Sequence, residues 1–456
     1  MTTNLNPFAY NLSATLSADQ SELTIKYCLN ADVTSLKIVI EGEGQTITHN
    51  VTEASKRKKT VADKPYFSPY EETFSTDGLG AGTFTWRIEV TGDGRNEIQV
   101  YSQDGTNAHT YPFYLPSSVD IVKDTRSFNY GKVIVVEGSH SGKGNANFHS
   151  NEIGAGLYVF NPDFTPILNR NNKPGFNGGS ATWGNTTNAY FANTTHAPRR
   201  VRVSKDGRIF VSSMYKHTAT KHPYIHGIVL WEVDPYFSQW STVMGAGVNG
   251  AKYDVTAISA DNTTYYKNQL LTSGGSFIAA PCAGLDVRDE GAQLKLLLLS
   301  CDYRAFAANY QGFHLCEYNL GTATTWGSTP SKTFNVTTEN ATTNPTKRLF
   351  AAPTNSNVQY DKDGGVWCIS NRAATSADQP ALVHKNADLS EDYRNTARKN
   401  TKNAGFRFNN DYTKVIIATE GSIGTIYDYT TKANGYFINP TQIDMSAAGE
   451  YLNDFA

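Results

Sequence analysis

The chain has 456 residues, of which 40 are Lys or Arg and 42 are Asp or Glu, so its formal net charge is −2. This balance removes the basic surplus that nucleic-acid binding needs, and no nucleic-acid partner is predicted. No window approaches the roughly 18 apolar residues of a membrane-spanning helix. The length exceeds one ordinary domain, and 26 Tyr, 22 Phe and 37 Gly favour strands and tight turns.

The first 115 residues carry short segments in which apolar and polar residues alternate. Leu23, Ile25 and Tyr27 alternate in this way, and so do residues 36–40 and 83–90. Further short strands are predicted at 98–101 and 111–114. A period of two residues indicates strands with one buried face, and strands at this spacing predict a β-sandwich over residues 1–115. Residues 55–72 are basic and then rich in Pro and Tyr, which predicts a long surface loop.

Three stretches of this region resemble the Ig-like module of flagellar hook-capping proteins, which also begins secreted Bacteroidetes proteins. They are Asn6–Tyr10, Leu23–Asn30, and the Gly-rich turn 78–81 with the following Gly82–Trp86. The resemblance covers roughly residues 5–115. It implies a spacer or docking module without catalytic activity.

From residue 116 the sequence repeats one pattern: a strand, a polar turn and an apolar strand. Four copies align at 201–213, 285–300, 358–370 and 406–418, and a fifth with a longer turn spans 120–136. Asp206-Gly207 and Asp363-Gly364 lie at the turns, where Gly supplies the positive φ of a tight hairpin. We therefore predict equivalent hairpins in different repeats.

A further apolar strand follows each hairpin after a polar loop. These strands are predicted at 156–160, 227–231, 312–316, 381–384 and 424–427. Four strands per repeat are typical of β-propeller blades, so residues 116–456 are predicted to form a β-propeller. The fold class is therefore all-β. Five blades are visible, and a closed ring is predicted to have six or seven. The tail at 449–456 resembles an inner strand, and either the first repeat completes its blade or the chain is truncated within a sixth or seventh blade.

The Ig-like start, together with Val119–Ile121 and Phe128–Val133, resembles secreted Bacteroidetes proteins with a YncE/NHL-like propeller. The resemblance is one of architecture and implies no residue roles. The N-terminus MTTNLNPFAY has neither the basic start nor the apolar stretch of a signal peptide. Either the protein is cytoplasmic or a signal has been removed. Composition and resemblance favour the second, which implies a secreted, periplasmic or cell-surface protein.

The five cysteines predict no metal or cofactor site. They are Cys28, Cys282, Cys301, Cys316 and Cys368. Their odd number and the absence of CxxC spacing argue against a zinc site or a disulfide framework. Each lies in or beside an apolar strand pattern and is interpreted as a small buried hydrophobe. A Cys301–Cys316 bridge across a hairpin stays open.

Candidate ligand-binding side chains gather in the loops between the second and third strands of the repeats. Because alternate strands run in opposite directions, all of these loops should emerge at one face, where binding residues are common. One further candidate, Arg200, opens an inner strand. The predicted ligand-binding residues are His140, His149, Arg200, Lys216, His217, His222, Tyr303, Arg304 and Arg372.

Two functional hypotheses remain. The first is a non-catalytic surface or periplasmic scaffold whose propeller contacts a glycan, peptide or protein. The alternative is a propeller-based polysaccharide lyase or hydrolase acting on an acidic glycan, in which a His serves as base and Arg200 or Arg304 neutralises the substrate carboxylate. No GxSxG or HExxH motif occurs, so no catalytic residue is assigned and the binding hypothesis is favoured.

Overall fold

The computed structural model describes a large part of the chain, and its regular elements are strands and short 3-10 turns. The described residues are 7–60, 62–63, 66–67, 69–92, 116–137, 156–162, 167, 198–213, 228–235, 237, 240–245, 247–254, 257–260, 263–266, 269–271, 277–279, 282–300, 314–327, 330–335, 357–369, 382–388, 390–395, 403–419 and 423–444. The predicted all-β class is confirmed. None of the helical turns in this part of the chain is long and apolar enough to cross a membrane.

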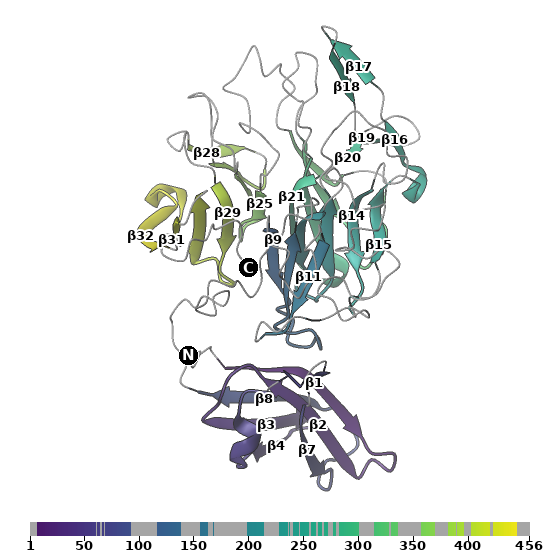
Figure 1. Cartoon of the computed structure of the whole chain (residues 1–456), viewed down its shortest axis with the longest axis vertical. Coiled ribbons are helices and arrows are strands. Elements are labelled where there is room, and N and C mark those ends of the chain that lie inside the picture. The colour runs from purple at the N-terminus through teal and green to yellow at the C-terminus, as the bar shows by residue number, and fades with distance from the viewer. Residues whose placement is uncertain are drawn as a thin grey trace. The chain divides into compact units, whose positions relative to one another are not determined.

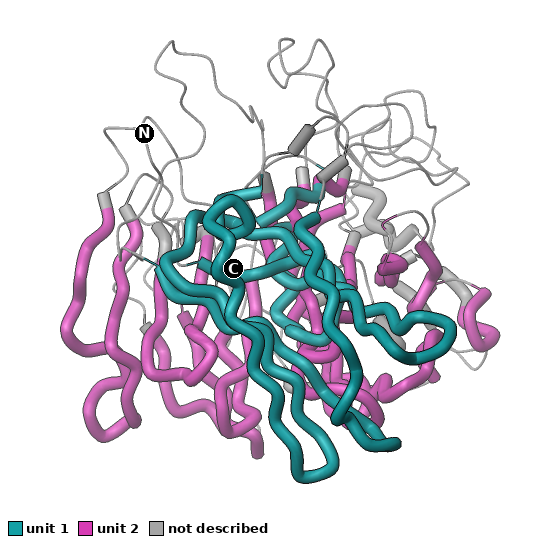
Figure 2. The backbone as a smooth tube through the Cα atoms, turned by 90° about the horizontal axis from the view of Figure 1, so that it is seen from below, with its two compact units in different colours: residues 1–110, 121–133, 159–168 teal, residues 111–120, 134–158, 169–456 magenta. Residues whose placement is uncertain are grey.

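The chain divides into two compact units (Figure 2). Unit 1 comprises residues 1–110, 121–133 and 159–168, and unit 2 comprises the rest. Within unit 1 the ring of Phe8 meets Tyr130 edge-on, with centroids 5.4 Å apart, and lies against Gly131. This contact ties the segment 121–133 to the N-terminal residues of the same unit.

Unit 1 contains two three-stranded antiparallel sheets, ordered β1-β2-β7 and β4-β3-β8 (Figure 1). The strands are β1 (Ala9–Leu16), β2 (Glu22–Leu29), β3 (Ser35–Gly42), β4 (Gln45–Asn50), β7 (Tyr70–Ser75) and β8 (Thr85–Thr91). A short hairpin of β5 (Ala62–Asp63) and β6 (Tyr66–Phe67) and the 3-10 turn Ala54–Arg57 precede β7.

The two sheets of unit 1 share one apolar core. Ile25 and Tyr27 of β2 lie in it with Ile38 of β3, as the alternation predicted. Removal of apolar surface from water on this face stabilises the packing of the two sheets. The predicted loop at 55–72 is wrong in part, because β7 begins at Tyr70 and pairs with β2. The strands predicted at 98–101 and 111–114 lie outside the described residues.

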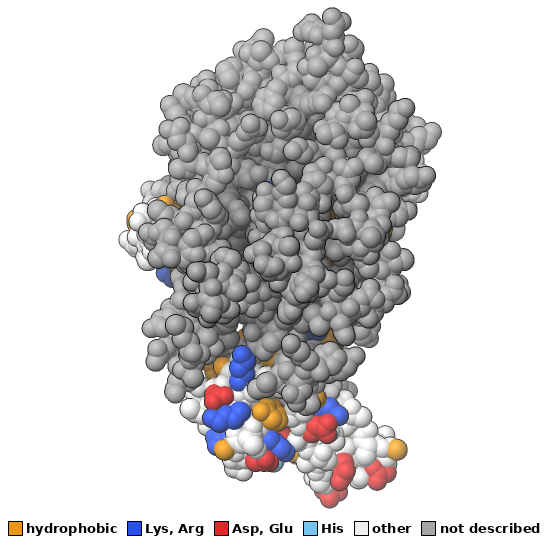
Figure 3. All heavy atoms as spheres, viewed as in Figure 1, with side chains coloured by type: hydrophobic (Ala, Val, Ile, Leu, Met, Phe, Trp, Pro, Cys, Tyr) orange, Lys and Arg blue, Asp and Glu red, His pale blue; other side chains and the backbone are white. Residues whose placement is uncertain are grey.

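On the face of unit 1 visible in Figure 3, acidic and basic side chains are interspersed. Exposed ion pairs occur in unit 1, such as Lys58 with Asp32 at 2.9 Å. Neither sign of charge gathers there, in agreement with the net charge of −2 for the whole chain.

The described part of unit 2 is built mainly from five consecutive antiparallel sheets. The first is three-stranded, with order β11-β10-β9, and the other four are four-stranded meanders in chain order. Their strands are, for the first sheet, β9 (Pro116–Ile121), β10 (Val133–Glu137) and β11 (Gly156–Phe160); for the second, β12 (Pro198–Val203), β13 (Ile209–Ser213), β14 (Ile228–Val233) and β15 (Trp240–Gly245); for the third, β21 (Cys282–Arg288), β22 (Lys295–Ser300), β23 (His314–Asn319) and β24 (Lys332–Asn335); for the fourth, β25 (Asn357–Tyr360), β26 (Val366–Ile369), β27 (Leu382–Lys385) and β28 (Glu391–Asn395); and for the fifth, β29 (Asn403–Phe408), β30 (Lys414–Thr419), β31 (Ile423–Tyr429) and β32 (Phe437–Asp444).

Between the second and third sheets the chain forms additional strands. A three-stranded sheet, ordered β16-β19-β20, accompanies a hairpin of β17 and β18. Their bounds are β16 (Lys252–Asp254), β17 (Ala257–Ala260), β18 (Thr263–Tyr266), β19 (Gln269–Leu271) and β20 (Phe277–Ala279). The repeat pattern in the sequence did not indicate this insertion.

The predicted hairpins are confirmed. Asp206-Gly207 lies in the turn between β12 and β13, and Asp363-Gly364 lies in the turn between β25 and β26. Gly207 and Gly364 have φ of 82° and 85°, the left-handed conformation for which Gly is suited. Both turns connect the first strand of a sheet to its second, so the repeat alignment was correct at these positions.

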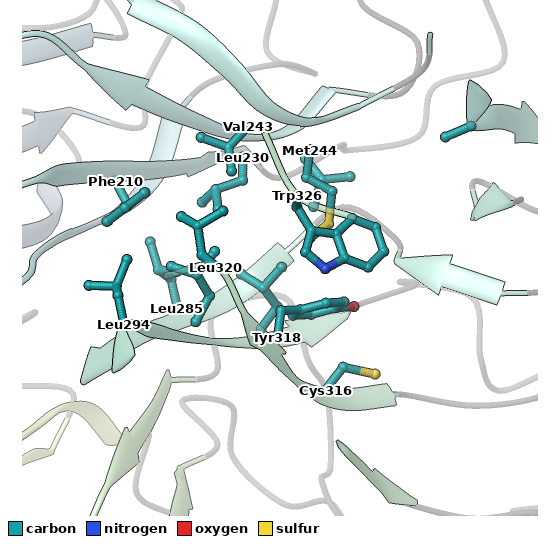
Figure 4. Packing of buried hydrophobic residues seen from close by; sticks show 14 residues of the cluster. Phe210, Leu230, Val243, Met244, Leu285, Leu294, Cys316, Tyr318, Leu320 and Trp326 are labelled. Atoms are coloured by element: carbon teal, nitrogen blue, oxygen red, sulfur yellow. The ribbon is translucent and has the colours of Figure 1, made fainter. Parts of the chain in front are cut away.

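Consecutive sheets of unit 2 pack face to face, and β22 shows how the sequence encodes this. Leu296 and Leu298 of β22 join a core with Phe210 and Val243 of the second sheet (Figure 4). The alternating residues Leu297 and Leu299 join another core with the fourth sheet. A strand buried on both faces has no polar side to keep, and for this reason 296–299 is an uninterrupted Leu run.

Three cysteines have the predicted environment. Cys28, Cys316 and Cys368 are buried thiols that form no disulfide. The alternative of a bridge between Cys301 and Cys316 is therefore wrong, and Cys316 instead packs in the core between the second and third sheets. The side chains of Cys282 and Cys301 lie outside the described residues.

Candidate functional site

The first strands of the sheets of unit 2 lie side by side, since β21 contacts both β12 and β25, and β25 contacts β29. Each strand places one polar residue between two apolar ones at the same position of the repeat. We name these residues, with two polar neighbours, the central polar cluster. Its members are Ser118, Asp120, Arg202, Asp286, Asn357, Gln359 and Arg407.

One hydrogen bond recurs between neighbouring first strands. The carboxylate of Asp120 accepts from the backbone N–H of Val203 at 2.8 Å. Asp286 accepts from Tyr360 N–H at 2.8 Å. The side chain of Gln359 accepts from Phe408 N–H at 3.3 Å. The polar side chain of one sheet thus pairs with a backbone donor of the next, and buried donors need such partners.

Arg202 links four of the five sheets. Its Nη1 donates to Ser118 Oγ of the first sheet at 3.1 Å, and its Nη2 donates to Asn357 Oδ1 of the fourth at 3.2 Å. Its Nε lies 3.7 Å from Asp286 Oδ1 of the third. The side chain is only 1% exposed. The planar, multidonor guanidinium suits contacts in several directions at once.

Arg407 connects the fifth sheet to the first. Its Nη2 donates to Asp120 Oδ1 at 2.8 Å, and its Nη1 lies 3.8 Å from Asp286 Oδ1. Asp120 and Arg407 are 287 positions apart in the chain. Contacts of the polar side chains therefore run from the first sheet through the intermediate ones and back to the first.

Burial dominates the electrostatics of the central polar cluster. It raises the pKa of Asp286, although Arg407 and Arg202 act in the opposite direction. Two Arg and two Asp within the cluster balance one another in charge. A buried charge needs a partner, so these side chains are required for packing the first strands and are not free to act on a solvent-borne substrate.

Of the nine predicted ligand-binding residues, the structure describes only Arg200. Its side chain is 2% exposed and donates from Nη1 to the carbonyl oxygen of Ser117 on β9. Its guanidinium therefore has a structural hydrogen bond inside unit 2, whereas the sequence analysis treated it as a ligand-binding group. The other eight lie outside the described residues, and their roles stay predictions: His140, His149, Lys216, His217, His222, Tyr303, Arg304 and Arg372.

The described strand ends bear on the placement of these eight residues. Each lies between a second strand and the following third strand, for example between Ser213 and Ile228 or between Ser300 and His314. In an antiparallel meander the ends of all second strands and the starts of all third strands are at the same edge. The turns between first and second strands, such as 204–208, are at the opposite edge.

The central polar cluster was not predicted from the sequence, although a repeated sequence pattern marks its residues. Asp120, Arg202, Asp286, Gln359 and Arg407 each stand between two apolar residues at one aligned position. The pattern shows a mid-strand polar residue repeated once per sheet. It does not show which side chains pair. Among the described residues, no group of three His, Cys, Asp or Glu side chains could hold a metal ion.

Comparison with known proteins gives similarity to solved structures alone. No family model matches the chain, and no curated protein matches it. A chain from a mitotic checkpoint complex matches at 10% identity and a TM-score of 0.37, covering 78% of this chain and 92% of that one. The C-terminal WD40 domain of Sif2 matches at 10% identity and a TM-score of 0.32, covering 99% and 91%. The dihydro-heme d1 dehydrogenase NirN matches at 8% identity and a TM-score of 0.32, covering 95% and 66%. Scores this low support no functional argument.

Proposed function

We propose that unit 2 is a closed five-bladed β-propeller that serves as a non-catalytic binding scaffold. Its ligand, a glycan, peptide or protein, contacts the edge at which the second strands of the sheets end. Residues 1–115, nearly all of which lie in unit 1, are then an Ig-like spacer or docking module, and the whole is a secreted, periplasmic or cell-surface protein.

The observation that carries this proposal is the return contact of the central polar cluster. Successive sheets bond through their first strands, and Arg407 of the fifth sheet pairs with Asp120 of the first. A row of sheets that returns to its own start is a ring. A ring packed in this way is rigid at its centre, and a rigid scaffold that presents loops is well suited to binding.

The position of the connections supports a binding edge. Long connections leave the end of every second strand of the first four sheets, at 138–155, 214–227, 301–313 and 370–381. The first-to-second turns of the last four sheets are short. The long connections contain eight of the nine predicted ligand-binding residues, all except Arg200.

No observation in the described residues favours the lyase or hydrolase alternative. Its proposed cation at Arg200 is buried and donates to Ser117. A group that neutralises a substrate carboxylate has to reach the substrate. The binding hypothesis needs no such residue.

The experiment is a screen of the full chain against a glycan array and a peptide array, followed by measurement of Kd for each hit. We expect His217→Ala, His222→Ala and Arg304→Ala combined to weaken binding at least about tenfold, a loss of about 1.4 kcal/mol. The matched control is Lys205→Ala with Lys362→Ala, because both are exposed residues in first-to-second turns. Equal loss in both variants, or no hit on either array, contradicts the proposal.

A further inference from the structure

His384 lies on β27 and is almost fully buried, with 3% of its side chain exposed. Both of its ring nitrogens are within hydrogen-bond distance of a carboxylate. Nε2 lies 2.8 Å from Asp361 Oδ2, and Nδ1 lies 2.6 Å from Asp392 Oδ1. One imidazole thus joins the first-to-second turn of the fourth sheet to β28.

The same group of residues reaches the fifth sheet. Tyr436, which directly precedes β32, donates its hydroxyl proton to Asp392 Oδ2 at 2.5 Å. Trp367 of β26 lies over His384 with ring centroids 4.6 Å apart and stacks on Phe406 of β29. Its indole N–H donates to the hydroxyl of Tyr429 at 3.1 Å. A charged chain of hydrogen bonds is therefore enclosed by aromatic rings at the junction of the fourth and fifth sheets.

The geometry requires a particular protonation state of His384. A neutral imidazole has one N–H and can donate to one carboxylate, whereas the imidazolium donates to both. Asp361 is held in place because its Oδ1 accepts from the backbone N–H groups of Asp363 and Gly365. It cannot turn away from the ring without breaking the turn. The two short contacts are thus both hydrogen bonds only when the ring is protonated.

The pKa directions agree with this geometry. Burial alone would lower the pKa of His384, but hydrogen bonds to Asp361 and Asp392 outweigh it and raise that pKa. Burial would raise the pKa of Asp361, and the bond to His384 with the backbone donors lowers it. The pKa of Asp392 is also lowered, because bonds from Tyr436 and His384 outweigh its burial.

Other ionisable groups face these residues from the surrounding elements. Lys432, on the 3-10 turn Lys432–Asn434, attracts Asp392 and favours its ionised form. Burial raises the pKa of Tyr429 and of Tyr436, so both stay neutral over the range in which His384 titrates. The negative charge of Asp363 also raises the pKa of Tyr429. The ring of Tyr393 on β28 contacts the ring of Trp367.

We infer that Asp361, His384, Asp392 and Tyr436 form a protonation-dependent clamp that holds the fifth sheet against the fourth and releases it when His384 loses its proton. Deprotonation leaves one ring N–H between two carboxylates, so either Asp361 Oδ2 or Asp392 Oδ1 loses its hydrogen bond, and both lose the positive charge between them. Their other oxygens keep the bonds from the turn and from Tyr436. A buried carboxylate that loses its counter-charge is destabilised. The inference concerns the junction of two sheets and does not depend on any ligand.

The sign of the pH dependence follows from the direction of each shift. The pKa of His384 is raised on folding, so its contribution is complete below the ordinary histidine value near 6.5 and disappears as the pH rises through the folded value. The pKa values of Asp361 and Asp392 are lowered. Their contribution is present above the ordinary value near 3.9 and is lost as the pH falls through the folded values.

The test is hydrogen–deuterium exchange of the full chain from about pH 6 to about pH 9, corrected for intrinsic exchange. We expect protection of β29–β32 to fall by about tenfold or more with rising pH, since loss of a hydrogen bond to a charged group changes an equilibrium by at least about that factor. Protection of β12–β15 should stay within about twofold over the same range. Constant protection of the fifth sheet, or equal loss in both sheets, overturns the inference.

The variant that sharpens this test is Asp392→Asn. An Asn amide donates to neutral His384 at Nδ1 and still accepts from Tyr436, so one N–H on the ring is enough and no carboxylate is left without a partner. We expect its fifth sheet to keep its protection within about twofold at high pH. The control is His49→Gln in unit 1, in which the protection of β29–β32 should fall with rising pH as it does in the wild type. A step in Asp392→Asn like that of the wild type also overturns the inference.

Discussion

Two ion pairs of unit 1 and one ion pair of unit 2 lie in opposite surroundings. In unit 1 the pair Lys26–Glu71 joins side chains that are 40% and 53% exposed, and Arg87–Glu41 joins side chains that are 49% and 43% exposed. In unit 2 the pair Arg407–Asp120 is 10% and 2% exposed. These two pairs of unit 1 lie on sheets that an apolar core already joins, whereas the Arg407–Asp120 pair lies where the first strands of unit 2 meet.

The difference has an energetic consequence. An exposed pair contributes about 0–1 kcal/mol, because water screens it and both side chains lose freedom. Removing one member of a buried pair costs about 3–5 kcal/mol, because the remaining charge has no partner. Identical residue types are therefore dispensable in one unit and structurally essential in the other.

The largest effect should come from Arg407→Met, which leaves Asp120 buried without its cation. We expect a loss of about 3–5 kcal/mol in the free energy of unfolding of unit 2, measured by urea denaturation. Adding Asp120→Asn removes the negative charge that faced Arg407 and keeps an oxygen to accept from Val203, so the double variant should recover about half of the loss. A loss below about 1 kcal/mol in the single variant would show that the pair does not hold the first and fifth sheets together.

Core substitutions should reduce the free energy of unfolding slightly less than Arg407→Met does. They should also have similar effects in the two units, unlike substitutions in the ion pairs. Leu298→Ala in β22 and Ile38→Ala in β3 each delete a fully buried aliphatic side chain. Each should lower the stability of its own unit by about 2–5 kcal/mol. Thermal unfolding followed by tryptophan fluorescence and by calorimetry should show a separate transition for each unit. If both transitions shift together in both variants, the division into two units is contradicted.

The smallest effect should come from Arg87→Met on the surface of unit 1. The side chain pairs with Glu41 and Glu89 on an exposed strand face. We expect little or no change in the free energy of unfolding of unit 1, and any change should vanish in about 1 M salt, because salt screens exposed charges. A salt-independent loss of stability comparable to that of Arg407→Met would contradict the conclusion that exposed pairs contribute less than buried pairs.

Local patterns in the sequence predicted much of the fold. Alternation at Leu23, Ile25 and Tyr27 gave β2 and its buried face, and Asp363-Gly364 marked a hairpin turn. The strand β7 was missed because a basic, Pro-containing stretch precedes it and hides the alternation of Tyr70, Glu72 and Phe74. Local signals of this kind depend on residues within a few positions of one another.

The candidate site was harder to predict. The sequence marked Arg200 as a polar residue at the start of an inner strand, and only the packing decided that its side chain is buried against Ser117. Cys316 likewise read as either a bridge or a core residue until the structure placed it as a buried thiol that forms no disulfide. Both decisions depend on which side chains surround the residue.

The sequence by itself determined the all-β class, the repeated strand–turn–strand pattern and the turns at Gly207 and Gly364, because periodicity and backbone preference are local properties. The tertiary structure alone decided that Asp120 pairs with Arg407 and that His384 lies between two carboxylates. Asp120 and Arg407 are brought together by the packing of whole sheets, and His384 and its two carboxylates by strand pairing within the fourth sheet. Charge complementarity between residues hundreds of positions apart leaves no periodic trace in the chain, and so it becomes visible only after folding.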